Sequence, residues 1–190
     1  MNIGIFGGSF NPIHNGHIHV AEAALAQALL DQVWMMVSPQ NPLKTHEQLP
    51  HALRYHLTRI ALHGYDSIFA SAFEASLPTP SYTWHTLLSL KQRWPQHQFS
   101  LIIGQDNLQN FHKWYHWQDI LANHQLIVYP REDNNSPSNF PFASSSHPQW
   151  LQGRFVNISS TEIRQRILSK EDISNLTPSI VQPLLTLLYK

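Results

Sequence analysis

Short apolar runs alternate with segments of helical periodicity along most of this chain. Six runs of four or five residues, mainly apolar, have the length of buried strands. They occupy residues 3–6, 33–37, 67–70, 99–103, 126–129 and 154–158. Between and after them, apolar residues three or four positions apart predict helices at residues 18–30, 52–63, 82–93, 106–111, 116–121, 160–168 and 179–188.

This alternation predicts an α/β fold with a doubly wound, mostly parallel sheet and helices on both of its faces. No internal repeat divides the chain, so residues 1–190 are expected to form a single domain. Residues 132–148 are rich in asparagine, serine and proline, which predicts a mobile surface loop. Ligands of such sheets bind beyond the carboxyl ends of the strands, where the strand order reverses.

The composition narrows the classes of partner. The chain has 12 basic and 12 acidic side chains, and this balance disfavours nucleic acid or a membrane surface, both of which need a basic excess. No apolar run approaches the roughly 20 residues that span a bilayer, and no signal peptide is recognisable. Cysteine is absent, which excludes disulfides and thiolate chemistry and fits a cytoplasmic protein.

Residues 7–17, which read GGSFNPIHNGH, join the first predicted strand to the first predicted helix. A glycine turn into a helix N-terminus is a ready anion site, because its backbone N–H groups lack intrahelical partners and the helix dipole adds partial positive charge. His14 and His17 are three residues apart and can face the same side of the turn. The segment therefore predicts a polyphosphate cradle with two imidazoles directed at it.

The spacing of this segment matches neither the Gly-x-Gly-x-x-Gly dinucleotide fingerprint nor the P-loop. The alternative is a structural turn whose glycines serve only packing. The histidine pair and a second candidate anion site near the C-terminus favour phosphate binding. The other histidines form no i, i+4 pair beside an acidic third ligand, which disfavours a zinc site.

Residues 158–164, which read ISSTEIR, carry the chemistry of a helix start. Ser159 or Ser160 can cap the helix, and Glu162 can close its first turn. Taken alone, capping explains these residues. Arg164 lies one turn on and adds a guanidinium beside the exposed N–H groups, so hydroxyls, amides and a cation together make a second anion clamp. Two clamps in one α/β domain suit a triphosphate.

These two segments resemble the signatures of a known superfamily. Residues 7–17 are similar to the Gly-Gly-Thr/Ser-Phe-Asp-Pro-x-His-x-Gly-His motif of nucleotidyltransferases with a Rossmann-like fold, and residues 158–164 to their Ile-Ser-Ser-Thr-x-x-Arg motif. Four more segments resemble the bacterial nicotinate mononucleotide adenylyltransferase family in order and approximate spacing. They are residues 42–44 (PLK), 80–83 (PSYT), 102–106 (IIGQD) and 113–115 (KWY). The resemblance covers nearly the whole chain.

The chain departs from this family pattern at two positions. Asn11 stands where the first motif has aspartate, which removes a carboxylate role there, although asparagine also suits a tight turn. Gln105 stands where alanine or serine is usual. Both changes are mild, and we expect position 11 to be structural.

The resemblance implies adenylyl transfer from ATP to nicotinate mononucleotide, giving nicotinate adenine dinucleotide (deamido-NAD) and pyrophosphate. It makes His14, His17 and Arg164 the candidate catalytic residues. The other implied ATP contacts are Gly7, Gly8, Ser9, Phe10, Gly104, Asp106, Ser159, Ser160 and Thr161. For Asp106 the alternative is an N-cap of the following helix. Mg²⁺ is expected on the ATP phosphates, held mainly by water and nucleotide, and no prosthetic group is expected.

The second substrate needs a site for a flat ring that bears a carboxylate. Trp114 offers a stacking face, Thr83 lies at a helix start, and Tyr115 offers its backbone amide. Lys44 and Arg54 are candidates for the mononucleotide phosphate. The structural alternatives are a packed aromatic ring for Trp114, a helix cap for Thr83 and a solvated helix face for Arg54.

Other functions stay open from the sequence. Within the superfamily, the acceptor can be another phosphate compound, such as pantetheine phosphate or glycerol phosphate, with adenylyl or cytidylyl transfer. Outside catalysis, the chain can be a nucleotide-binding protein or a histidine-rich metal-binding protein. The sequence does not decide whether the chain forms a homo-oligomer, or whether it prefers the nicotinate or the nicotinamide mononucleotide.

Overall fold

A six-stranded parallel sheet forms the centre of this computed structural model, which describes residues 1–40, 49–130, 148–152 and 158–189. The strand order is β3-β2-β1-β4-β5-β6, and it reverses between β1 and β4. The strands are β1 (Asn2–Gly8), β2 (Gln32–Val37), β3 (Ile68–Ser71), β4 (Gln98–Gly104), β5 (Leu126–Tyr129) and β6 (Gln149–Trp150). The predicted α/β fold is confirmed, and every strand pairing is parallel.

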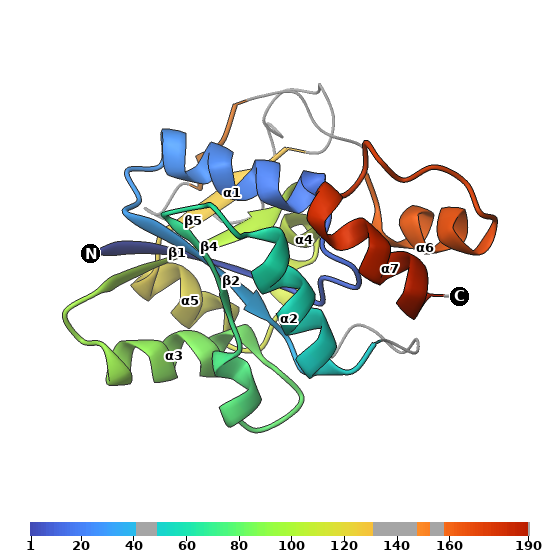
Figure 1. Cartoon of the computed structure of the whole chain (residues 1–190). Helices are drawn as coiled ribbons and strands as arrows, with labels where there is room; N and C mark the ends of the chain where they lie inside the picture. Colours follow the sequence, from blue (N-terminus) through green and yellow to red (C-terminus); the bar gives the residue numbers. More distant parts are fainter. Residues whose placement is uncertain (41–48, 131–147, 153–157, 190) are drawn as a thin grey trace.

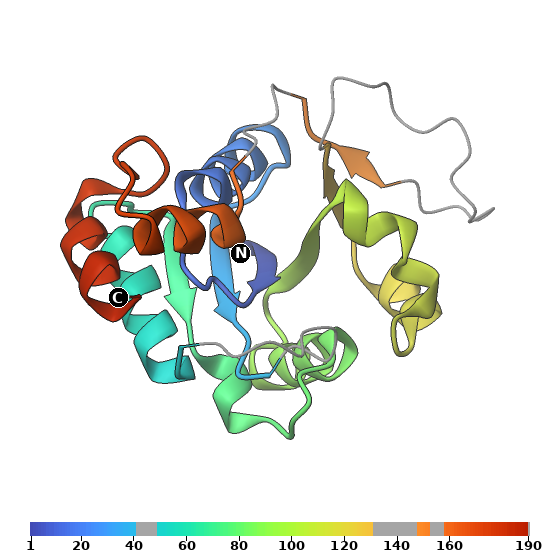
Figure 2. The ribbon, with the colours of Figure 1, turned by 90° about the vertical axis from the view of Figure 1, so that its right-hand side faces the viewer.

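Helices cover both faces of the sheet (Figures 1 and 2). One face packs against α1 (Asn15–Gln27), α2 (His51–Ala61), α6 (Ser160–Leu168) and α7 (Gln182–Leu188). The other packs against α3 (Thr83–Arg93), α4 (Gln105–Gln109) and α5 (Trp117–Asn123). Short 3₁₀ helices complete the connections: η1 (Phe73–Ser76), η2 (Phe111–Lys113) and η3 (Ser179–Val181).

The strands read as continuous apolar runs because both of their faces are buried. In β2, Val33, Met35 and Val37 belong to the core under α1 and α2, whereas Met36 belongs to the core under α3. Successive side chains of a strand point to opposite faces, so a strand covered on both sides needs apolar residues at every position.

Several elements differ in detail from the prediction. The first helix starts at Asn15, three residues earlier than expected, because the His14 ring caps it. Residues 153–157, which hold most of the predicted strand 154–158, lie outside the described part of the chain, as do residues 132–147 of the predicted loop. The sixth strand is β6, which comes before that segment and pairs with Ile127 and Val128.

No helix in the described part of the chain is long and apolar enough to cross a membrane.

The C-terminal helix α7 packs onto the same core as α1 and α2. Leu185 is completely buried, whereas Leu187 is 66% exposed on the same helix. Replacing Leu185 with alanine is expected to lower the free energy of unfolding by about 2–5 kcal/mol, because it leaves a cavity in this core. The measurement is urea denaturation followed by circular dichroism.

The matched control is Leu187→Ala, for which a change within about 0.5 kcal/mol is expected. Equal losses in the two variants would contradict the placement of α7 in the core.

Candidate active site

The site lies where the strand order reverses, at the carboxyl ends of β1 and β4. Gly7 and Gly8 end β1, and Gly104 ends β4 and is the N-cap of α4. The N–H group of Ser38, just after β2, donates to the carbonyl of Gly8 at 2.9 Å and continues the sheet pairing there. This is the edge at which doubly wound sheets bind nucleotides.

The loop between β1 and α1 is folded inward rather than exposed. Ser9, Phe10 and His14 are each at most 5% exposed. Phe10 adopts a φ of 44°, a strained value for a bulky residue, and its ring packs edge-on against the rings of Phe6 and His17. A Cβ atom at Gly8 would lie 3.0 Å from the Phe10 ring, so glycine there makes room for this packing.

His14 and His17 lie side by side at the start of α1. Their rings stack with centroids 3.5 Å apart. The Nδ1 atom of His14 also accepts a hydrogen bond from the backbone N–H of His17 at 3.3 Å, which makes His14 the N-cap. The three-residue spacing thus places the two imidazoles together at a helix N-terminus, where the dipole favours an anion.

The start of α6 is docked directly onto this loop, and Figure 2 shows the two segments together. The Ser160 hydroxyl donates to the carbonyl of Pro12 at 2.9 Å. Arg164 donates through Nη1 to the carbonyl of Asn11 at 2.6 Å and through Nη2 to the Thr161 hydroxyl at 3.2 Å. The two segments predicted to bind phosphate are therefore in direct contact.

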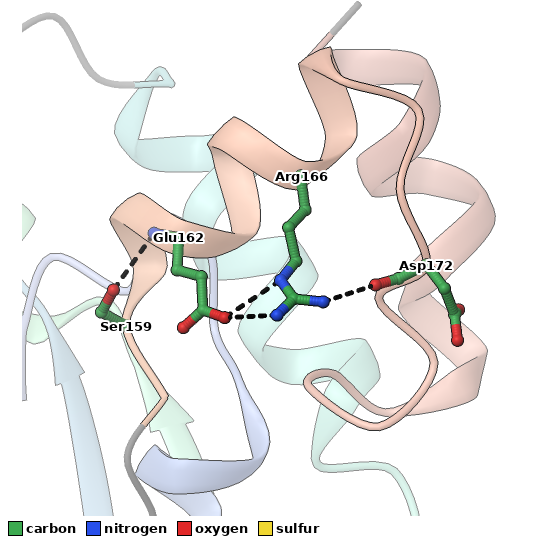
Figure 3. Close-up of polar contacts among 4 residues, drawn as sticks. All are labelled: Ser159, Glu162, Arg166 and Asp172. Atoms are coloured by element: carbon green, nitrogen blue, oxygen red, sulfur yellow. Dashed lines mark hydrogen bonds and ion pairs between the residues drawn. The ribbon is translucent and has the colours of Figure 1, made fainter.

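Ser159 caps α6 by accepting a hydrogen bond from the Glu162 N–H group at 3.1 Å (Figure 3). The Glu162 carboxylate does not close a capping box. It pairs with Nε and Nη2 of Arg166 at 3.0 and 2.9 Å, and Arg166 also reaches the carbonyl of Asp172. This ion pair offsets the negative charge of Glu162. An unpaired carboxylate at the helix start would compete with a bound anion for the positive end of the helix dipole.

A cavity of about 350 Å³ opens beside the glycines of β1. Gly7 and Gly8 form part of its wall. Thr83, Trp114 and Tyr115, the three residues predicted for the ring of the second substrate, also line it. The structure thus brings the predicted ring residues together from α3 and from the segment after η2.

Sequence reasoning missed several residues that line the same cavity. Ser81 and Lys113 lie inside two of the segments that resemble the family, so that resemblance could have indicated them. Glu74, Thr86 and Asn107 also line it. Glu74 is 5% exposed and accepts a hydrogen bond from the Thr86 hydroxyl at 2.7 Å. Nothing in the periodicity indicated Glu74, because it falls between two predicted elements.

Arg54 was expected to contact the mononucleotide phosphate, and this expectation does not fit the structure. The side chain is 1% exposed. Its guanidinium donates to the carbonyls of Leu49, Ser9, Ser38 and Pro39 at 2.6–3.1 Å. Burial lowers its pKa from the ordinary value. Buried loop carbonyls need donors, so Arg54 holds the loops after β1 and β2 in place.

The family aspartate is replaced by Asn11 without loss of an acceptor. The Oδ1 atom of Asn11 accepts hydrogen bonds from the Leu49 N–H group at 3.2 Å and from the Tyr189 hydroxyl at 2.6 Å. Burial raises the pKa of Tyr189, against the opposing effect of the nearby guanidiniums of Arg164 and Arg54. The phenol therefore keeps its proton and donates it, which confirms a structural role for position 11.

Of three other predicted residues, the structure describes Gly104 and Asp106 but not Lys44. Gly104 caps α4, so the capping alternative for Asp106 does not apply. Asp106 lies exposed in the first turn of α4, at the carboxyl end of β4. Lys44 lies outside the described residues. Within the described residues, no group of three histidine, aspartate or glutamate side chains is arranged to hold a metal ion.

Comparison with known proteins agrees with this architecture. A family model described as cytidylyltransferase-like matches residues 5–166, which contain both phosphate segments. A protein of Plasmodium falciparum, a nicotinic acid mononucleotide adenylyltransferase solved in complex with NaAD, has the same fold. Its TM-score is 0.77 at 20% identity, covering 99% of this chain and 97% of that one. The fold and the site thus define a nucleotidyltransferase of the cytidylyltransferase-like class.

Sequence relatives narrow this class. A protein of Flavobacterium psychrophilum is 42% identical over 179 residues, covering 94% of this chain and 92% of the relative. One of Cytophaga hutchinsonii is 39% identical over 186 residues, covering 97% and 95%. Both are named "Probable nicotinate-nucleotide adenylyltransferase". The chain belongs to the nicotinate-nucleotide adenylyltransferase family.

Replacing Arg54 with lysine tests its role as a structural donor. An ammonium cannot reach four carbonyls in the fork geometry of a guanidinium, so the free energy of unfolding should fall by about 2–4 kcal/mol. The measurement is chemical denaturation.

Arg59→Lys is the matched control, since Arg59 is exposed on the same helix and its replacement should change stability by less than about 0.5 kcal/mol. If the Arg54→Lys protein kept full stability but bound the mononucleotide more weakly, Arg54 would be a contact of the mononucleotide phosphate after all.

Proposed function

We propose that this protein transfers the adenylyl group of ATP to nicotinate mononucleotide and so makes nicotinate adenine dinucleotide in NAD biosynthesis. The observation that carries this proposal is the juxtaposition of two sites. A cavity with aromatic and helix-start residues opens beside Gly7 and Gly8, and the loop after these glycines carries two imidazoles and the docked start of α6. Family membership supports the choice of substrates.

The ATP phosphates would lie between the start of α1 and the start of α6. The imidazoles of His14 and His17 would donate hydrogen bonds to phosphate oxygens, with His17 nearer the α-phosphorus. Backbone groups of Gly8, Ser9 and Phe10 would line the cradle. Stacking and the His14 cap hold both rings in place before substrate arrives, which reduces the cost of ordering them in the transition state.

The β- and γ-phosphates would be held by Ser159, Ser160, Thr161 and Arg164. Of the five N–H groups of a guanidinium, the contacts with Asn11 and Thr161 use one on each terminal nitrogen of Arg164. These contacts orient the guanidinium and leave other donors for a phosphate. On the opposite side of the site, Asp106 would accept a hydrogen bond from the adenosine ribose, and Gly104 would let that sugar approach.

The chemistry needs no general base from the protein. An oxygen of the mononucleotide 5′-phosphate attacks the α-phosphorus in line, the bond from that phosphorus to the bridging oxygen breaks, and pyrophosphate leaves with the electron pair. The attacking phosphate is already ionised, so catalysis is positioning and stabilisation of charge. Imidazoles, amides, hydroxyls and a guanidinium are poor Mg²⁺ ligands, so we expect this ion on the ATP phosphates.

Nicotinate would bind in the cavity. Its ring would stack on Trp114, and its carboxylate would meet the N–H groups at the start of α3 near Thr83 and the backbone amide of Tyr115. Lys44 is the candidate contact for the mononucleotide phosphate, because Arg54 is buried against loop carbonyls. We also propose a cytoplasmic location, which the absence of cysteine supports.

A coupled pyrophosphate assay tests the reaction and the acceptor together. ATP or CTP is combined with nicotinate mononucleotide, nicotinamide mononucleotide, pantetheine phosphate or glycerol phosphate. We expect pyrophosphate release with ATP and nicotinate mononucleotide. The kcat/KM for this pair should be at least about tenfold above that for every other pair of nucleotide and acceptor, which corresponds to about 1.4 kcal/mol. A higher value for the amide mononucleotide would overturn the choice of substrate.

His17→Ala locates this activity at the proposed site. If His17 acts on the reacting phosphate, its loss should lower kcat about 10²–10³-fold and change the KM for the mononucleotide much less. His56→Ala, on the exposed side of α2, is the matched control and should leave kcat unchanged. An unchanged kcat in His17→Ala would refute the role of this imidazole.

A further inference from the structure

The cavity proposed for the ring has a carboxylate in its wall that the reaction above does not use. Glu74 comes from η1, on the connection between β3 and α3. It is 95% buried, with a relative exposure of 5%, and it lines the cavity together with Thr83 and Trp114. Acidic side chains are rarely buried to this extent unless they are paired.

The two oxygens of Glu74 have different surroundings. Oε1 accepts a hydrogen bond from the Thr86 hydroxyl at 2.7 Å. Oε2 is buried and has no hydrogen-bond partner among the described residues. Leaving a buried carboxylate oxygen without a partner is costly. The occupied cavity is therefore expected to supply a cation or a donor to Oε2.

The position of Glu74 indicates which part of the substrate it meets. Thr86 lies one helical turn after Thr83, so the two threonines share a face of α3. Glu74, bound to Thr86, thus lies next to the subsite between Thr83 and Trp114. A ribosylated nicotinate ring is a pyridinium, which carries a permanent positive charge on its nitrogen. A neighbouring carboxylate attracts that charge, and the face of a tryptophan favours it as well.

We propose that Glu74 is a substrate-binding residue whose carboxylate recognises the positive charge of the pyridinium ring. This inference rests on the proposed function and narrows its substrate class to acceptors with a cationic aromatic ring. The start of α3 would then bind the carboxylate of the zwitterionic ring, and Glu74 would attract its positively charged nitrogen. Acids with a neutral ring of the same shape would bind less well.

The test compares nicotinate mononucleotide with its 1,4-dihydro form, whose ring is uncharged, as acceptors for wild-type protein and Glu74→Gln. Glutamine keeps an oxygen for the Thr86 hydroxyl and nearly the same shape. We expect kcat/KM for the oxidised acceptor to fall about tenfold, equivalent to about 1.4 kcal/mol, mainly through KM. The value for the dihydro form should change less than twofold.

Two further variants separate charge recognition from a structural role. Thr86→Val removes the hydroxyl contact but keeps the charge, so it should preserve the preference for the oxidised acceptor. Glu171→Gln removes an exposed charge elsewhere and should leave kcat/KM unchanged for both acceptors. Equal losses for both acceptors in Glu74→Gln, matched by Thr86→Val, would show that Glu74 only holds α3 and would overturn the proposal.

A measurement on wild-type protein alone covers the case in which Glu74→Gln fails to fold. N-methylnicotinate and 3-methylbenzoate have the same shape and differ in the ring cation. As competitors of nicotinate mononucleotide, the first should show an inhibition constant at least fivefold lower, and equal constants would overturn the proposal. Absence of pyrophosphate release by wild-type protein would instead overturn the proposed function, so the two failures are distinguishable.

Discussion

The hydrogen bond from Arg164 to the carbonyl of Asn11 is the contact on which the site depends. It joins residues 153 positions apart and, with the bond from Ser160 to Pro12, fixes the start of α6 against the loop after β1. Each segment offers one helix N-terminus, and in the proposed function the two together hold the ATP triphosphate. Docked together, they place imidazoles, hydroxyls and a guanidinium around the same loop.

A second constraint is the burial of the loop itself. Its carbonyls and the Asn11 side chain lie away from water, so they need partners inside the protein. Arg54 supplies donors from α2, and Tyr189 supplies one from the C-terminal end of the chain. Both bonds hold the loop in one shape before a nucleotide binds. The proposed reaction needs only positioning and charge stabilisation, so it would benefit directly from this rigidity.

The sequence predicts the parts of this architecture that depend on local patterns. Buried strands, helix caps and the i, i+3 relation of His14 and His17 depend on neighbours a few residues away, so periodicity and residue type suffice for them. Arg54 was assigned to the mononucleotide phosphate, with a solvated helix face as the alternative, and Glu74 was not predicted at all. Both side chains are buried, and their partners come from other parts of the chain, which a local pattern does not show. The bond between Tyr189 and Asn11 spans 178 residues, and no local pattern encodes it.

The most direct test of the shared site is the affinity of a non-hydrolysable ATP analogue, measured by calorimetry on wild-type protein, His17→Ala, Arg164→Ala and the exposed control Arg59→Ala. One binding site is expected. Loss of charge-assisted contacts should weaken binding about 10–100-fold in each of the first two variants, with little change in the control. Unchanged affinity in Arg164→Ala would contradict the claim that both helix starts hold one triphosphate.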